Sequence, residues 1–215
     1  MRLCTFLFKK KAPFYLLKGH FSLSCGPIRD AATTKQIMDY NRIIEKYYTP
    51  GTELYNILVV HSRAVADRAL HIAAAHPEYG ADLEFIEAAA MLHDIGIVRC
   101  DAPGICCHGT EPYLRHGMIG AAMLRDEGLE RYARVCERHT GAGITVHDIE
   151  SRNLPLPHRD FLPETIEEQI ICYADKFYSK SHLDRTKTLE QAEKSIARFG
   201  DDGLQRFIKM EKMFR

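Results

Sequence analysis

The sequence of 215 residues is long enough for one large domain or two small ones, with a core that needs no disulfide bonds. Apolar residues make up 46% and charged residues 27% of the chain, which is typical of a globular protein. Basic and acidic residues both number 29, so the formal net charge is zero. No overall field favours a nucleic-acid or membrane partner, although local charges can still bind a small anionic substrate.

The seven cysteines are odd in number and form no C-x-x-C pair. This pattern favours free thiols in a reducing compartment over a disulfide framework, so we expect a cytoplasmic protein. The neighbours Cys106 and Cys107 are interpreted as two loop thiols, with a soft metal site or a redox pair as alternatives. No apolar run reaches the ~18 residues that span a bilayer, so no membrane partner is expected.

Residues 1–29 contain six basic side chains and no acidic one. Their one apolar run is too short for the core of a signal peptide, and the lysines follow it instead of preceding it. An organelle presequence is an alternative, but helical patterning starts near Thr34, and Met38 would make a natural start. We interpret 1–33 as an N-terminal appendage, either disordered or a mis-assigned start, and 34–215 as one helical domain.

From Thr34 onward the apolar spacing predicts helices and no convincing strand, which indicates an all-α fold. Thr52 and Asp82 are expected N-caps, and Thr165-x-x-Glu168 resembles a capping box. The segments between the helices include two long ones, 99–115 and 141–162, which we expect to be functional loops. The predicted helices cover 35–48, 52–75, 83–94, 116–127, 129–139, 163–181, 188–200 and 203–213.

The helix 83–94 is apolar almost all round, so it belongs in the centre of the domain, and Gly96 is expected to end it. Its last residues are the charged pair His93-Asp94. Burying such a pair without compensation would cost several kcal/mol. A divalent cation compensates efficiently, because imidazole suits Zn, Fe, Mn or Ni and a carboxylate can bridge two metals.

Four other residues lie in a similar context, at or near apolar helical stretches or helix ends. They are His61, His116, His139 and Asp175. Each alone has an ordinary explanation, because a buried histidine more often bonds a backbone carbonyl and an acid at a helix end often pairs with a cation. Together they favour a metal centre, since the chain would otherwise have to compensate several buried polar ends separately. A second His-Asp pair, His147-Asp148, lies in a polar loop and is interpreted as a decoy, or at most as a substrate contact.

The order His61, then His93-Asp94-Ile95-Gly96, then Asp175 resembles the HD superfamily of metal-dependent phosphohydrolases over residues 54–181. The resemblance implies an HD-domain helical bundle and one metal held by His61, His93, Asp94 and Asp175. In the binuclear members, such as bacterial diadenosine tetraphosphate hydrolases, two further histidines hold a second metal. His116 and His139 fit those places, which implies two divalent metals (Fe, Mn, Zn or Ni) bridged by Asp94.

The resemblance implies hydrolysis of a small phosphorylated substrate of the nucleotide class, with Asp94 as the catalytic residue that orients the attacking water. Lys176 and Arg99 are the expected phosphate contacts, and His108 is expected to reach the substrate. Two alternatives stay open. A di-iron oxygenase uses the same ligands on the same fold, and a non-catalytic binding domain would use the metal for stability alone. The oligomeric state is not indicated.

Overall fold

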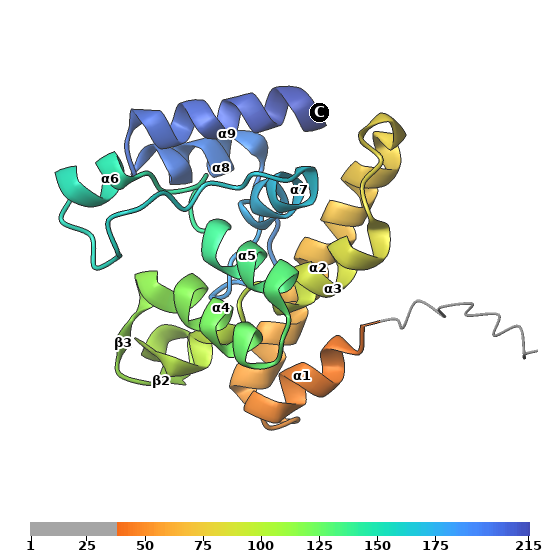
Figure 1. Ribbon diagram of the computed structural model, residues 1–215, viewed down its shortest axis with the longest axis vertical. Coiled ribbons are helices and arrows are strands. Elements are labelled where there is room, and N and C mark those ends of the chain that lie inside the picture. The colour runs from red at the N-terminus through yellow and green to blue at the C-terminus, as the bar shows by residue number, and fades with distance from the viewer. Residues whose placement is uncertain (1–37) are drawn as a thin grey trace, which may run out of the picture. The chain divides into compact units, whose positions relative to one another are not determined.

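Helices provide most of the regular structure in residues 38–215, the part of the chain that the computed structural model describes (Figure 1). The appendage expected at 1–33 lies outside the described residues. The helix bounds are α1 Tyr40–Tyr47, α2 Glu53–Ala75, α3 Leu83–Leu92, α4 His116–Asp126, α5 Glu130–Arg138, α6 Val146–Ser151, α7 Ile166–Asp175, α8 Leu189–Ala197 and α9 Asp201–Phe214. The predicted all-α fold is confirmed.

The predicted N-caps are present in the structure. The side chain of Thr52 accepts a hydrogen bond from the backbone of Tyr55, and that of Asp82 accepts one from Phe85. Thr165 and Glu168 form a complete capping box at the start of α7. These local bonds satisfy backbone N–H groups that a helix start leaves without partners, which is why the sequence alone locates the helix starts.

Two helix ends differ from the sequence-based prediction. α3 ends at Leu92 instead of residue 94, and α7 ends at Asp175 instead of near residue 181. His93 and Lys176 are the C-caps, so the chain turns directly at the residues that were expected to carry the charged groups. Helix ends set by tertiary contacts leave a weaker local signal than helix starts.

The sequence predicted that Gly96 would end the helix in a left-handed conformation, and this prediction is wrong. Gly96 lies inside a 3-10 turn, Ile95–Arg99, that packs against α4. A Cβ atom at this position would lie 2.1 Å from the backbone oxygen of His116 and 2.4 Å from the backbone nitrogen of Gly120. The glycine is therefore required because two backbones approach closely, and this contact fixes the start of α4 beside the end of α3.

The two long loops contain short elements that the sequence did not reveal. A small sheet forms in 99–115, where the strand β1 Cys100–Ala102 pairs antiparallel with β2 Cys107–His108 and parallel with β3 Glu111–Pro112. The loop 141–162 contains α6. Strands of two or three residues are too short to show an alternating pattern, so the absence of a strand prediction has a simple cause.

The core lies where α2, α3 and α7 meet, with α5 packed against α3 and α7. Figure 1 shows α8 and α9 beside α7, on the side away from α1. Tyr173 of α7 stacks on Phe207 of α9, with ring centroids 5.2 Å apart, which anchors the C-terminal helices to the core. Fully buried aliphatic side chains fill the centre, among them Leu58, Val65, Ile86, Leu92, Ile170 and Ile171.

The cysteines of the described segment are free thiols, as expected: Cys100, Cys106, Cys107, Cys136 and Cys172. Cys4 and Cys25 lie outside it. None of the metal-binding groups found in residues 38–215 includes a cysteine, which supports the interpretation of Cys106 and Cys107 as two thiols of a loop. No helix in this part of the chain is long and apolar enough to cross a membrane.

The contact at Gly96 gives a first prediction. Gly96→Ala should destabilise the protein by about 1–3 kcal/mol or more, because the added methyl group meets backbone atoms that cannot move aside. Urea unfolding measures this change. Gly104→Ala is the matched control, since a Cβ atom at Gly104 meets no atom within 4 Å. Equal stability of Gly96→Ala and wild type would contradict the packing role.

Candidate metal centre

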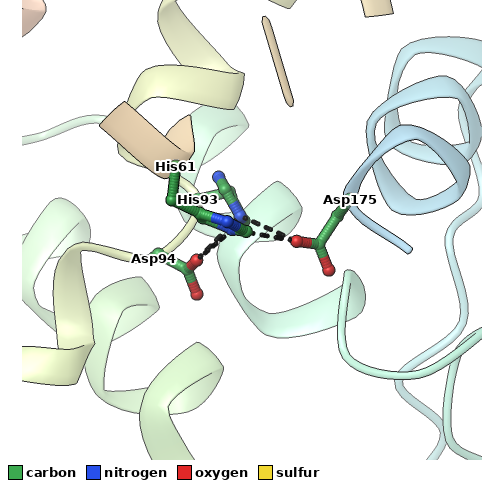
Figure 2. A group of neighbouring side chains, drawn as sticks. All are labelled: His61, His93, Asp94 and Asp175. Atoms are coloured by element: carbon green, nitrogen blue, oxygen red, sulfur yellow. Dashed lines mark ion pairs between the residues drawn. The ribbon is translucent and has the colours of Figure 1, made fainter. Parts of the chain in front are cut away.

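Four side chains from three helices meet in the core of the protein (Figure 2). His61 comes from the middle of α2, His93 and Asp94 follow α3, and Asp175 ends α7. The Nε2 atom of His61 lies 3.1 Å from Asp94 Oδ2 and 3.0 Å from Asp175 Oδ1. The Nε2 atom of His93 lies 2.9 Å and 3.6 Å from the same two oxygens. One potential ligand atom from each residue therefore points to a common centre.

A second group shares Asp94 with the first. The other carboxylate oxygen of Asp94, Oδ1, lies 3.4 Å from the Nε2 atoms of both His116 and His139. Those two nitrogen atoms are 3.0 Å apart. His116 begins α4 and His139 follows α5, so the close approach of the turn 95–99 to α4 helps to assemble this group. Asp94 thus lies between two sets of ligand atoms and offers one oxygen to each.

The Nδ1 atoms of His93, His116 and His139 are all held by the backbone carbonyl three residues earlier in the chain. The carbonyls belong to Ala90, Tyr113 and Cys136, at distances of 2.6, 2.7 and 2.7 Å. A carbonyl can only accept, so each Nδ1 donates and each Nε2 presents its lone pair to the cluster unless it is also protonated. Metal-binding histidines are commonly oriented by this kind of bond.

Several buried atoms of the cluster have no hydrogen-bond partner of acceptable geometry. They are both ring nitrogens of His61, Nε2 of His93 and both oxygens of Asp94. The histidine Nε2 atoms lie about 3 Å from Asp94 Oδ2, which brings opposite charges close, but the angles at these atoms are not those of hydrogen bonds. Since buried polar atoms are normally satisfied, a cation is the missing partner that this set of nitrogens and oxygens fits.

The electrostatics keep the carboxylates ionised. Burial alone would raise the pKa of Asp94, but His93 and Lys180 outweigh it and hold that pKa well below the usual range. Burial lowers the pKa of His116 to about 3, and the neighbouring His139 adds to the effect. For His93 burial also opposes the charge, but Asp94 and Asp175 raise the pKa to about 9. Asp94 and His116 are therefore in the forms that bind metals, whereas His93 carries a proton near neutral pH when no cation is present and would release it on metal binding.

Lys180 is a residue of the site that the sequence analysis missed. Its Nζ atom lies 2.5 Å from Asp94 Oδ2, and its side chain is largely buried. In a helix that continued to residue 181, Lys180 would simply follow Lys176 on the same face. Because α7 ends at Asp175, the chain turns and brings the ammonium group back to Asp94. The second lysine after Asp175 was the only local signal of this contact.

The three predicted substrate contacts lie in different places. Lys176 is buried, and its Nζ atom donates to Asp175 Oδ2 at 2.6 Å and to the carbonyl of His139 at 2.9 Å. It therefore ties together two ligand-bearing segments. Arg99 and His108 are exposed and do not line the cavity beside the cluster. Substrate binding by these three residues stays a prediction.

A cavity of about 460 Å³ opens beside the cluster and is called here the metal-site cavity. His116, His139 and Asp175 line it together with three lysines, Lys176, Lys180 and Lys187. A narrower and more apolar cavity of about 230 Å³ adjoins it and shares the wall formed by Tyr113 and His116. The site can thus hold an anionic group next to an apolar one.

The decoy interpretation of His147-Asp148 agrees with the structure. His147 is exposed. Asp148 completes the capping box of α6 with Thr145 and pairs with Arg206 at 2.7 Å. These contacts give the carboxylate a structural role at the wall of the apolar cavity, and neither residue belongs to the metal-binding groups of the described segment.

The cluster predicts that divalent metal stabilises the folded protein. Adding Mn²⁺ after chelation should raise the thermal midpoint, because a ligand at 100 times its dissociation constant adds about 2.7 kcal/mol of stability. His61→Ala should lose most of this shift. His71→Ala should keep it, since His71 is an exposed residue of the same helix. The assignment fails if the wild type shows no shift or if both variants lose it equally.

Comparison with known proteins supports this description. The HD domain family matches residues 58–179, a segment that contains all six clustered residues. An uncharacterized protein of Methanocaldococcus jannaschii, MJ0778, is 35% identical over 145 residues, which cover 66% of this chain and 78% of that protein. No solved structure matches significantly.

Two further relatives carry the name tRNA (cytidine(56)-2'-O)-methyltransferase. The enzyme of Thermoplasma volcanium is 32% identical over 188 residues, and that of Picrophilus torridus is 34% identical over 137 residues. The matches cover 86% and 63% of this chain but only 49% and 35% of those enzymes. The family match over more than half of the chain, together with the buried His/Asp cluster, shows that the chain belongs to the HD domain family.

Proposed function

We propose that the protein is a metal-dependent phosphohydrolase that cleaves a phosphoester or phosphoanhydride of a small nucleotide-like substrate. The family indicates a metal-dependent hydrolase. The observation that carries the finer proposal is the position of Asp94, whose two oxygens face two separate histidine groups beside a cavity lined by lysines. Two-metal sites of this kind promote phosphoryl transfer in many hydrolases.

In this proposal His61, His93 and Asp175 would hold one metal, His116 and His139 would hold the other, and Asp94 would contribute one oxygen to each set. Divalent cations held there would supply a water of lowered pKa and a Lewis acid for a phosphoryl oxygen. The chain supplies the orientation. Hydrogen bonds from Nδ1 to backbone carbonyls fix the rings of His93, His116 and His139, and the buried Asp94 holds the place where the nucleophile would lie.

Lys180 and Lys187 are the phosphate contacts that the geometry favours. Both line the metal-site cavity. The Lys180 ammonium would have to leave Asp94 when a cation binds there, and the adjoining cavity is the space that can receive it. A lysine in that position can stabilise negative charge on a phosphoryl group. Lys176 already has two partners, so in this proposal it orients Asp175 and the carbonyl of His139.

The apolar cavity supports a substrate with a ring. Leu114, Ile144, Leu154, Ile196 and Phe199 are among its lining residues. A flat group such as a nucleobase would be removed from water there while its phosphate lies beside the cluster, since small-molecule sites combine apolar walls with a few polar groups. Methyl transfer is not proposed, because the match covers half or less of the relatives that carry that name.

The hydrolase proposal predicts turnover without oxygen. Anaerobic protein loaded with Mn²⁺ should release phosphate from at least one member of a nucleotide panel, whereas a di-iron oxygenase would require O₂.

His116→Ala should bind one metal per chain instead of two and should lose about 100-fold in kcat, the usual effect of removing a group that stabilises the transition state. Metal analysis and phosphate release measure the two quantities.

Three results would contradict this proposal. The first is turnover that depends on O₂, which would identify an oxygenase. The second is metal-dependent stability with no turnover of any phosphoester, which would identify a binding domain. The third is a wild type with one metal per chain that His116→Ala leaves unchanged, which would refute the binuclear centre.

Lys180→Gln gives a separate prediction with opposite signs for two measurements. Metal affinity should increase, because the variant removes a cation that competes for Asp94. The kcat/KM for phosphoester hydrolysis should fall about 10- to 100-fold, because a charged contact to phosphate is lost. Calorimetric titration with Mn²⁺ and steady-state kinetics measure these effects. A fall in both quantities would indicate damage to the cluster instead.

The same assay tests the substrate contacts expected from the sequence. Arg99→Gln and His108→Ala change exposed residues outside the metal-site cavity. A loss of kcat/KM in either variant would support its predicted role, and it would require the loop that carries these residues to move over the substrate. Unchanged kinetics would assign phosphate binding to the lysines of the cavity.

A further inference from the structure

A third hollow, of about 450 Å³, adjoins the metal-site cavity between the segment 179–187 and α8. We call it the basic groove. Its walls carry His182, Arg185, Lys187, Lys194 and Arg198, and no carboxylate lines it. In a chain whose charges balance overall, this is a local concentration of positive charge.

The charge arises from the way α8 is oriented. Gln191, Lys194, Ser195 and Arg198 line the groove, and the spacing of three, four and seven residues places them on one face of the helix. The acidic residues of this helix, Glu190 and Glu193, do not line the groove. The basic side chains of α8 therefore face the groove, and its acidic side chains do not.

The basic charges are not neutralised locally. Neither Lys194 nor Arg198 has a carboxylate within 4 Å among residues 38–215, and Arg185 has only the exposed Asp184, at 3.6 Å. Burial, together with Lys176, Lys180 and Arg198, lowers the pKa of Lys187 in spite of the opposing effect of Asp175. Positive charge is therefore in excess, and an anion would relieve the repulsion.

The groove and the metal-site cavity lie side by side. Ser179, Lys187 and Ser195 line both of them and form the wall that they share. A ligand that contacts the metal cluster would reach the groove by extending past these three residues. The family match ends at residue 179, so α8 and the segment before it lie outside the part that defines the family. Apart from Ser179, the residues of the groove therefore lie outside the segment that supplies the metal ligands.

We propose that the basic groove binds a second phosphate group of the substrate, separate from the phosphate that lies at the metal centre. This inference rests on the proposed hydrolase function. It narrows the substrate class to small molecules with two separate phosphate groups, such as a nucleoside 3′,5′-bisphosphate. Lys194 and Arg198 bind the second phosphate, and Lys187 lies between the two phosphate positions.

The size and composition of the groove favour a small substrate over a nucleic acid. From Gln191 to Arg198 the basic face extends only about 10 Å along the helix, at 1.5 Å per residue. No Phe, Tyr or Trp side chain lines the groove, whereas proteins that bind single strands usually stack bases on such rings. The groove therefore offers charge for one phosphate or a diphosphate, and no surface for bases.

The test uses the double variant Lys194→Gln/Arg198→Gln and a matched control, Lys209→Gln/Lys212→Gln. The control removes the same charge from exposed positions of α9 that line none of the cavities described above. Calorimetry at low salt first measures the binding of inorganic pyrophosphate to the metal-free full-length protein. Kinetics of the Mn²⁺-loaded protein then give the ratio of kcat/KM for adenosine 3′,5′-bisphosphate to that for adenosine 5′-monophosphate.

We expect the groove variant to lose about tenfold in pyrophosphate affinity and about tenfold in the kinetic ratio, while the control keeps both. Equal values in the groove variant and the wild type would overturn the inference, as would equal losses in the control. Tighter binding of a ten-nucleotide single-stranded RNA than of pyrophosphate, lost in the groove variant, would also overturn it in favour of a nucleic acid. The two proposals can fail separately, because pyrophosphate binding needs no turnover. If the groove variant loses pyrophosphate affinity but the wild type hydrolyses no substrate, the hydrolase proposal is refuted and phosphate binding by the groove is not.

Discussion

Asp94 is a fully buried carboxylate with no hydrogen bond to either oxygen, and the rest of the centre is arranged to compensate its charge. Histidines from α2, α3, α4 and α5 and a lysine that follows α7 approach its two oxygens. Removing a carboxylate from water costs many kcal/mol unless other groups replace the solvent. The five helices therefore converge on one residue, and the same convergence creates two adjacent sets of metal ligands.

Close packing of glycine makes this convergence possible. Gly96 and Gly120 allow the turn after α3 to contact the backbone of α4, which brings His116 to the side of Asp94 opposite His61. Backbone carbonyls then hold the rings of three histidines. Because these carbonyls belong to α3, to the turn before α4 and to α5, the ligand geometry depends on the positions of whole helices. A change in helix packing would therefore also change the positions of the ligand atoms.

The segment after α7 has a different task. It supplies Lys180 to the cluster, Lys187 to the metal-site cavity and the basic face of α8 to the groove. Most of it lies beyond the family match at 58–179. The ligands and most of the walls of the metal-site and apolar cavities thus come from the part that matches the family, whereas Lys180, Lys187 and most of the basic groove come from the part beyond it. In our proposal the second phosphate is therefore recognised by residues that hold no metal.

The sequence alone determined most helix positions, through capping residues and apolar spacing. It also determined the six candidate ligands, because charged or polar groups at the ends of apolar helices need compensation, and the structure brings these six residues together. Metal binding by them stays a prediction. Only the tertiary structure decided where α7 ends, why residue 96 is glycine, and that Lys180 rather than Arg99 or His108 lies at the cluster. Helix starts depend on bonds between neighbours in the chain, whereas these features depend on contacts between distant segments, which leave no local pattern.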